Sequence, residues 1–225
     1  SSTSIYPCNT ITKDSKGNVC IANMSTQIDA KAIVVNYVDV KTGWAEELCR
    51  LTCPDGGRAD NISIYGDVRA DKYYVFAAIK GSNRVIRWTV EGDSCTMEEC
   101  TLRSFYPASA SSLGTAPLVI PITENDILVD GVSTYLTRCD FSTGNITESF
   151  EEKKSVAPSN AASSGGKIFS MADKTYIAHS YNYEKSTNPS NAQLVSINEQ
   201  MDFSSMKSMW VFPQAGLGGV NIGTK

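Results

Sequence analysis

The sequence predicts an all-β protein in which short strands are grouped into similar consecutive units. Helical periodicity is nearly absent, and short runs rich in Val, Ile, Tyr and Phe recur along the whole chain between Gly, Asp, Asn and Ser residues. The former residues suit a pleated, half-buried strand and the latter suit turns. The clearest predicted strands are Asn18–Ala22, Ala32–Val40, Tyr73–Ile79, Arg84–Val90, Ile127–Val129, Thr134–Arg138, Lys167–Met171, Tyr176–Ser180 and Gln193–Ile197.

A strand that ends in a tight turn recurs along the chain. Its copies are Val38–Gly43, Trp88–Asp93, Cys139–Gly144 and, more weakly, Ser196–Met201. Successive turns are roughly 50 residues apart, which is the length of a four-stranded propeller blade. In each unit an inner strand precedes the strand that leads to the turn, and these inner strands are Asn18–Met24, Asn61–Gly66, Pro117–Pro121 and Lys167–Met171.

These observations predict a β-propeller of about four blades in a single domain. One small twisted sheet cannot bury both of its faces alone, so the sheets are expected to stack around an axis. The expected blades are residues 1–58, 59–112, 113–163 and 164–225. A β-sandwich is the rival architecture, but it does not predict such a period. Because Gly218–Gly223 looks like the entry to a further inner strand, the chain is either a closed propeller or part of a longer one.

The composition excludes several classes of function. The chain has 225 residues, a formal net charge of −4 and a pI near 5.1, and no basic cluster is longer than Lys153–Lys154. Nucleic acid is therefore not an expected partner. No apolar run approaches the ~18 residues that cross a bilayer, so no membrane-spanning segment is expected. The single histidine, His179, excludes sites with two imidazoles, and we expect it to be a hydrogen-bonded strand residue.

The seven cysteines leave three interpretations open. Cys49, Cys53, Cys95 and Cys100 have the donor type of a zinc site, but their spacing differs from the usual knuckle. One or two local disulfides would form in an oxidising compartment. The third interpretation is that the cysteines are small apolar strand residues, as the surroundings of Cys20 indicate. We predict no metal and no cofactor.

Three segments carry a resemblance to a known family. Gly17–Asn23, Gly57–Asp67 and above all Gly81–Val90 resemble a family of uncharacterised secreted Bacteroidetes proteins. These proteins carry a domain of unknown function interpreted as a β-propeller and are often lipid-anchored. The resemblance implies an exported protein of the periplasm or outer-membrane surface, whose signal and lipid-anchor cysteine precede the residues shown. Proteins of this family are commonly longer and have more blades than the four expected here. The resemblance implies no established activity. The cysteine content departs from the low-cysteine pattern expected of such proteins.

Pairs of carboxylates could support glycoside hydrolysis, which needs an acid and a nucleophile or base on either side of the scissile bond. The candidate groups are Asp67 with Asp71, Glu124 with Asp126 and Asp130, and Glu46 with Glu47. Adjacent strand residues point to opposite faces, so the last pair is expected at a solvated edge. No recognisable motif surrounds any of these groups, and no catalytic residue is assigned.

Two further motifs are interpreted as structural. The segment Thr12–Asn18 approaches the Asp-box of sialidase-type propellers, but its Asp and Gly residues serve a plain hairpin turn equally well. Arg87 and Trp88 are neighbours in a predicted strand. We expect one of these side chains to face the neighbouring blade and the other to lie on the opposite face.

Aromatic residues supply the predicted binding surface. Tyr181, Asn182 and Tyr183 lie in Ser180–Asn191, which is predicted to interrupt a hairpin as a polar loop. Long loops in compact domains are often functional. Flat aromatic faces with a polar group suit sugar rings and protein partners alike. Trp44, one residue after a turn glycine, and Trp210 could extend this surface.

The predicted function is a non-catalytic recognition module that binds a glycan or a surface protein through loops on one propeller face. An aromatic polar loop on a rigid scaffold, without a complete catalytic constellation, motivates this hypothesis. Two alternatives stay open. One is a glycoside hydrolase or lyase with an unrecognised carboxylate pair, and the other is a structural unit of a cell-surface assembly. Propellers host enzymes, receptors and scaffolds, so the fold decides among none of them.

Overall fold

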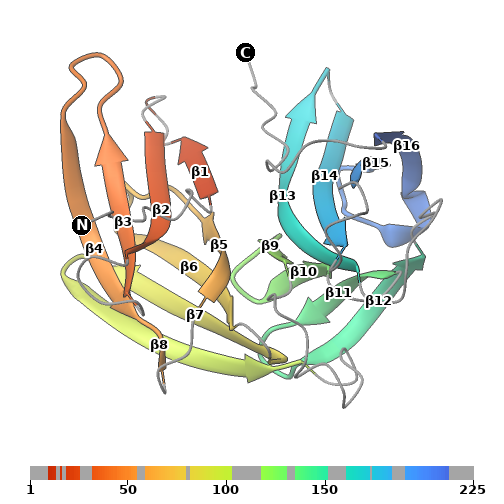
Figure 1. The fold of residues 1–225 in the computed structure, drawn as a ribbon, viewed down its shortest axis with the longest axis horizontal. Helices are drawn as coiled ribbons and strands as arrows, with labels where there is room; N and C mark the ends of the chain where they lie inside the picture. Colours follow the sequence, from red (N-terminus) through yellow and green to blue (C-terminus); the bar gives the residue numbers. More distant parts are fainter. Residues whose placement is uncertain are drawn as a thin grey trace.

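The fold consists of four antiparallel sheets of four strands each (Figure 1). The computed structural model describes residues 10–13, 16, 19–25, 32–54, 59–79, 82–102, 118–130, 135–151, 161–172, 174–183 and 191–212. Within each sheet the strands follow one another in chain order, so every sheet is a simple meander.

The strand boundaries are as follows. The first sheet contains β1 (Thr10–Lys13), β2 (Val19–Ser25), β3 (Ala32–Val38) and β4 (Ala45–Thr52). The second contains β5 (Ala59–Tyr65), β6 (Lys72–Ile79), β7 (Arg84–Glu91) and β8 (Ser94–Thr101). The third contains β9 (Leu118–Pro121), β10 (Asp126–Asp130), β11 (Tyr135–Asp140) and β12 (Asn145–Glu151). The fourth contains β13 (Ala161–Met171), β14 (Lys174–Tyr183), β15 (Asn191–Ile197) and β16 (Lys207–Phe212), with a single 3-10 turn, η3 (Phe203–Ser205), before β16.

The four sheets stand side by side along an arc, with the first and fourth sheets at its two ends (Figure 1). β5 contacts β1 and β2, β9 contacts β5 and β6, and β13 contacts β9. The first strand of each sheet therefore lies toward the centre of the arc. The last strands, β4, β8, β12 and β16, form the outer edges. This arrangement confirms the predicted propeller blades and shows that the rival β-sandwich is wrong.

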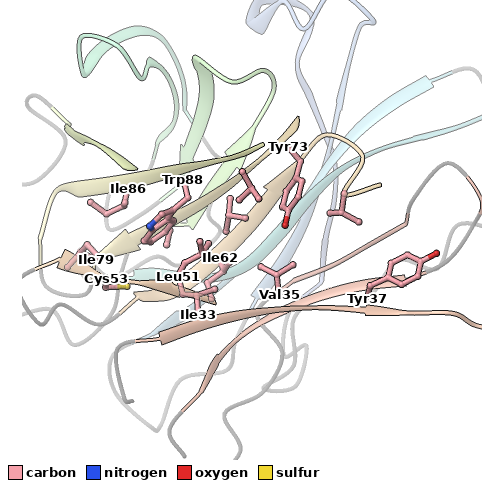
Figure 2. Packing of buried hydrophobic residues seen from close by; sticks show 14 residues of the cluster. Ile33, Val35, Tyr37, Leu51, Cys53, Ile62, Tyr73, Ile79, Ile86 and Trp88 are labelled. Carbon is pink, nitrogen blue, oxygen red and sulfur yellow. The ribbon is translucent and has the colours of Figure 1, made fainter. Parts of the chain in front are cut away.

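Alternate residues of the central strands pack against the two neighbouring sheets. On β6, Tyr73 and Val75 belong to a buried cluster shared with the first sheet, whereas Phe76 belongs to a cluster shared with the third. Figure 2 shows the first of these clusters, in which Trp88 is only 2% exposed. The side chain of Arg87 lies on the opposite face of β7, over the ring of Phe141 in the third sheet. The two side chains therefore lie on opposite faces of β7, as predicted.

The predicted repeat of turns is confirmed by the backbone geometry. Each turn contains one residue with a positive φ, which is +72° at Gly43, +55° at Gly92, +71° at Gly144 and +59° at Met201. The first and third turns are equivalent in detail. The side chains of Asp39 and Asp140 accept hydrogen bonds from the backbone N–H groups of Lys41 and Ser142, and the glycine N–H donates to the aspartate carbonyl at 2.8 Å in both.

Two details of the predicted strands are wrong. The inner strand of the first sheet is β1, and Asn18–Met24 corresponds to β2. β1 is only four residues long and contains one large apolar side chain, so its pattern is weak. The expected boundary at 163/164 falls inside β13, which begins at Ala161. β1 and β2 pair antiparallel with Lys13 opposite Val19, which fits the predicted hairpin, while most residues of its turn and Gly218–Gly223 lie outside the described residues.

No disulfide joins the cysteines whose side chains are described, which are Cys49, Cys53, Cys95, Cys100 and Cys139. No group of three or more His, Cys, Asp or Glu side chains among these described residues is arranged to hold a metal ion. The zinc site considered for the first four cysteines is therefore not formed. Cys8 and the side chain of Cys20 lie outside the described part. The described residues contain no helix that is long and apolar enough to span a membrane.

Candidate functional site

The aromatic residues predicted to bind ligand are divided between two sheets. Trp44 is 58% exposed in the turn between β3 and β4, at one end of the arc. Tyr181, Asn182 and Tyr183 lie in β14, and Trp210 lies in β16, both in the fourth sheet at the other end (Figure 1). The structure therefore does not bring Trp44 together with the other four residues.

The predicted polar loop is wrong in its first part. β14 continues to Tyr183, and Tyr181 pairs with Ser163 on one side and Asn191 on the other. The strand extends this far because tyrosine favours a pleated surface and both neighbouring strands supply partners. Residues 184–190, and the side chains of the three candidate residues in β14, of His179 and of Trp210, lie outside the described part.

The described surface instead carries two hollows, one between the second and third sheets and one formed by the third sheet alone. One hollow, of about 580 Å³, is formed on the second sheet by Lys72, Tyr74, Thr89, Glu91, Thr96 and Glu98 around Arg87, and on the third by Glu124 and Asn125. The adjoining hollow, of about 490 Å³, is formed around Arg138 by Asn125, Asp126, Asp140, Thr147 and Glu148. Because Asn125 belongs to both, we call the pair the polar groove, made of an Arg87 hollow and an Arg138 hollow.

Strand alternation explains why the polar groove forms here. Lys72 and Tyr74 on β6, and Thr89 two residues after Arg87 on β7, share the face of the second sheet that is turned toward the third. Further along the same face the residues become apolar, and Phe76 is buried in the cluster between the two sheets. The groove is thus the polar, open end of an otherwise packed inter-sheet junction.

Arg87 is held at the base of its hollow. It is 8% exposed, and its guanidinium lies 4.4 Å from the centre of the Phe141 ring. One terminal nitrogen donates to the backbone carbonyl of Glu124 and, at 2.7 Å, to the side-chain oxygen of Asn125. The other donates to the carboxylate of Glu98. Its buried Nε has no hydrogen-bond partner among the described residues.

Arg138 occupies the second hollow, at the irregularity in the pairing of β11 with β12. Its Nε donates to Asp126 at 2.9 Å, and one terminal nitrogen donates to Glu148 at 3.1 Å and to the carbonyl of Met201 at 2.7 Å. The hydrogen bonds that Arg138 donates to the Asp126 carboxylate, with smaller contributions from Glu148, raise the pKa of Arg138 further above its already high value. Arg138 therefore remains charged and joins the third sheet to the fourth.

Carboxylates outnumber cations in the polar groove. Its cationic side chains are Lys72, Arg87 and Arg138, whereas its acidic side chains are Glu91, Glu98, Glu124, Asp126, Asp140 and Glu148. The groove therefore repels polyanions. Both arginines are already bound by protein acceptors, so their positions are fixed before any ligand arrives.

Two of the carboxylates considered for catalysis form ion pairs with arginines. Glu46 forms an ion pair with Arg69, and Asp126 forms one with Arg138. A general acid needs a raised pKa near neutral pH. The pKa of Asp140 is instead lowered, because the hydroxyl and backbone N–H of Ser142 donate hydrogen bonds to its carboxylate. The Asp140 carboxylate therefore does not have the property of a general acid.

Sequence reasoning missed most of the groove. Arg87 was assigned a structural role, Glu124 and Asp126 were considered only as catalytic acids, and Arg138 and Asn125 were not singled out. One signal was available in the sequence. On the strand face that bears the groove, apolar residues are replaced by polar ones, Lys72 and Thr89, near one end of β6 and of β7. Arg87 and Asn125 are 38 residues apart in the sequence, so the sequence gives no indication of their 2.7 Å hydrogen bond.

Comparisons with known proteins show the fold. No family model and no curated protein sequence matches the chain. Among solved structures, it is similar to the Bacteroides ovatus xyloglucan PUL protein GH43B, with 13% identity, a TM-score of 0.54, and coverage of 94% of this chain and 42% of the other. It is also similar to the Myceliophteria thermophila Cps50 (Swd1) β-propeller domain, with 10% identity, a TM-score of 0.52, and coverage of 91% and 57%. The chain thus spans about half the length of these structures. At such identities the likeness concerns architecture alone, and the chain has a β-propeller fold.

Proposed function

We propose that the protein is a non-catalytic recognition module that binds a glycan or a surface protein through the polar groove. The observation that carries this proposal is the immobilisation of Arg87 and Arg138 by protein acceptors beneath an open surface. Groups that are already ordered lose little freedom when a ligand binds, so the groove is preorganised. Each hollow also has the volume typical of a ligand site.

Other observations support the same role. The resemblance of Gly81–Val90 to secreted Bacteroidetes propellers supports an exported protein at the periplasm or cell surface, held by a lipid anchor. The word xyloglucan in the name of one structural neighbour supports glycan as a ligand class. Tyr181, Asn182, Tyr183 and Trp210, all of the fourth sheet, remain a second proposed surface, and Trp44 at the other end of the arc is not part of it.

Two neighbouring glutamates on β8 provide a matched test. Glu98 pairs with Arg87 in the groove, whereas Glu99 pairs with Arg84 on the opposite face of the same strand. Each substitution by glutamine removes one ion pair between β7 and β8. We expect Glu98→Gln to weaken ligand binding, and Glu99→Gln and the double variant Tyr181→Ala with Tyr183→Ala to leave it unchanged.

The measurement is retardation in native gels that contain neutral polysaccharides, an acidic polysaccharide or a lysine-rich peptide conjugated to dextran. Reducing-end release from each retained polysaccharide is measured in parallel. Retardation that depends on Glu98 and not on Glu99 supports the groove. If retardation is lost only in the variant Tyr181→Ala with Tyr183→Ala, the binding site lies at β14 and the groove proposal is wrong. Catalytic release of reducing ends would contradict the non-catalytic role.

A further inference from the structure

We infer that the ligand of the polar groove is an extended, uncharged, hydroxyl-rich chain that lies across both hollows and passes over Asn125. This inference rests on the proposed function and adds the chemical class and the shape of the ligand. It is carried by the distribution of charge in the groove and by the residue that the two hollows share.

The charge distribution disfavours ionic ligands of either sign. An anionic chain would meet six carboxylates with only three cations to oppose them. Of those cations, Arg87 is bound by Glu98, and Arg138 is bound by Asp126 and Glu148. A cationic chain would meet a guanidinium in the middle of each hollow. A hydroxyl group avoids both conflicts because it can donate to a carboxylate and accept from an amide or an ammonium group.

The lining of the Arg87 hollow fits such a ligand. Thr96 contributes a hydroxyl from β8, Lys72 contributes an ammonium group from β6, and the turn between β9 and β10 contributes the carboxylate of Glu124. No hydrogen bond or ion pair joins the Glu124 carboxylate or the Thr96 hydroxyl to another side chain in the described part of the protein. Arg87 is more than nine-tenths buried and still has an Nε without an acceptor among the described residues. The Thr96 hydroxyl and the Glu124 carboxylate therefore offer the hollow a donor and acceptors that no other described side chain satisfies.

The extended shape follows from the position of Asn125. This residue lines both hollows, and its side-chain oxygen already accepts a hydrogen bond from Arg87 at 2.7 Å. The Arg87 hollow lies between the second and third sheets, whereas the Arg138 hollow is formed by the third sheet, from which Arg138 donates to the Met201 carbonyl beside the fourth. A compact ligand would fill one hollow, whereas a chain can fill both by passing over Asn125.

The experiment measures affinity as a function of chain length. The probes are linear neutral oligosaccharides of one to eight units prepared from xyloglucan, cellulose, mannan and arabinan, titrated by calorimetry into the whole protein. We expect the affinity for the best series to rise with length until both hollows are filled and then to stay constant. For a long oligosaccharide, Glu98→Gln and Glu148→Gln should each lower the affinity about tenfold, as loss of a hydrogen bond to a charged group predicts. For a disaccharide, only one of the two variants should have an effect.

Two controls keep the test independent of folding. Glu99→Gln should bind every probe like the unaltered protein, and Thr96→Ala removes a hydroxyl from the Arg87 hollow without breaking an ion pair. Glu98-dependent binding of the lysine-rich peptide, with no neutral oligosaccharide bound, would overturn the ligand class but leave the groove as the binding site. An affinity that is already maximal for a monosaccharide would overturn the extended shape. No groove-dependent binding of any probe would overturn the proposed function as well.

Discussion

Arg87 carries a buried positive charge from the second sheet to the third. Its guanidinium lies over the Phe141 ring and donates to the turn between β9 and β10 and to Glu98. Glu98 itself is mostly open to solvent, with 56% of its side chain exposed. Loss of Arg87 would therefore leave the Phe141 ring without its cover and the Glu124 carbonyl without its donor. The Glu98 carboxylate would be affected less, because water already reaches it.

Substitution of Arg87 should destabilise the protein far more than substitution of Arg84 on the opposite face of β7. We expect Arg87→Met to lower the free energy of unfolding by about 2–3 kcal/mol, since the buried acceptors lose their donor. The side chain of Arg84 is more exposed than that of Arg87, 25% against 9%, so Arg84→Met should cost about 1 kcal/mol or less. Urea unfolding of both variants measures the difference. Equal losses would contradict the inter-sheet role of Arg87.

Because of Cys139, we expect the free energy of unfolding to fall as the pH rises above about 8.5. Burial raises the pKa of its thiol to about 11. The thiol of the unfolded chain ionises near its ordinary pKa of about 8.5, whereas the folded thiol stays protonated to higher pH. The stabilisation is complete below the unfolded pKa and is lost as the pH rises toward the folded pKa, by about 1.4 kcal/mol per pH unit. Unfolding of the unaltered protein and Cys139→Ala between pH 8 and pH 10 measures this loss. A difference between them that stays constant with pH would refute it.

At the scale of single elements, the turns differ in how closely they approach neighbouring strands. Gly43 and Gly144 have nearly the same φ, +72° and +71°. A β-carbon at Gly43 would meet nothing within 4 Å, whereas one at Gly144 would lie 2.2 Å from the backbone oxygen of Thr101 in β8. The third turn is therefore packed against the second sheet, and the first turn is open.

Alanine at these two glycines should separate backbone strain from steric conflict. Gly43→Ala adds only the cost of a left-handed conformation, about 1 kcal/mol. Gly144→Ala adds a clash with backbone atoms, and we expect a loss of at least about 3 kcal/mol. Thermal and urea unfolding of the two variants, with Gly92→Ala as a further open turn, provide the comparison. Similar losses at positions 43 and 144 would show that the third turn moves away from β8 without penalty.

The sequence predicts elements well where a local pattern determines them. Asp39 and Gly43 are a recognisable turn because an aspartate side chain binds backbone N–H groups two and three residues later, and glycine accepts a positive φ. β1 was missed because four residues with one large apolar side chain carry little periodicity. Tyr181 and Tyr183 were assigned to a loop because the segment Ser180–Asn191 is polar, and its composition does not reveal that Tyr181 pairs with Ser163 and Asn191.

At the scale of the whole molecule, an arginine crosses each junction between neighbouring sheets. Arg69 leaves the loop between β5 and β6, lies 4.7 Å from the centre of the Tyr37 ring and pairs with Glu46, both of the first sheet. Arg87 joins the second sheet to the third, and Arg138 joins the third to the fourth. The period of about 50 residues predicted the stacking of sheets. The polar groove could not be predicted, because it forms only where two stacked sheets separate.

Breaking one junction should loosen the sheet beyond it before it affects the far end of the arc. In Arg138→Met, the carbonyl of Met201 loses its donor from the third sheet. We expect faster hydrogen exchange in β15 and β16 and unchanged exchange in β3 and β4, because stacked units are stabilised chiefly by their nearest neighbours. Exchange measured by mass spectrometry on peptides from each sheet tests this. Uniform acceleration in all sheets would show that they open together.

The outer position of β8 has a consequence for solubility. Every residue from Ser94 to Glu99 is exposed, and an edge strand of this kind offers unpaired backbone groups to another molecule. Glu98 and Glu99 place negative charge on both faces of that edge, so approaching copies repel one another. This protection weakens as the solution approaches the pI near 5.1, where the protein carries no net charge. Aggregation through the β8 edge should then become the chief hazard in concentrated, mildly acidic preparations.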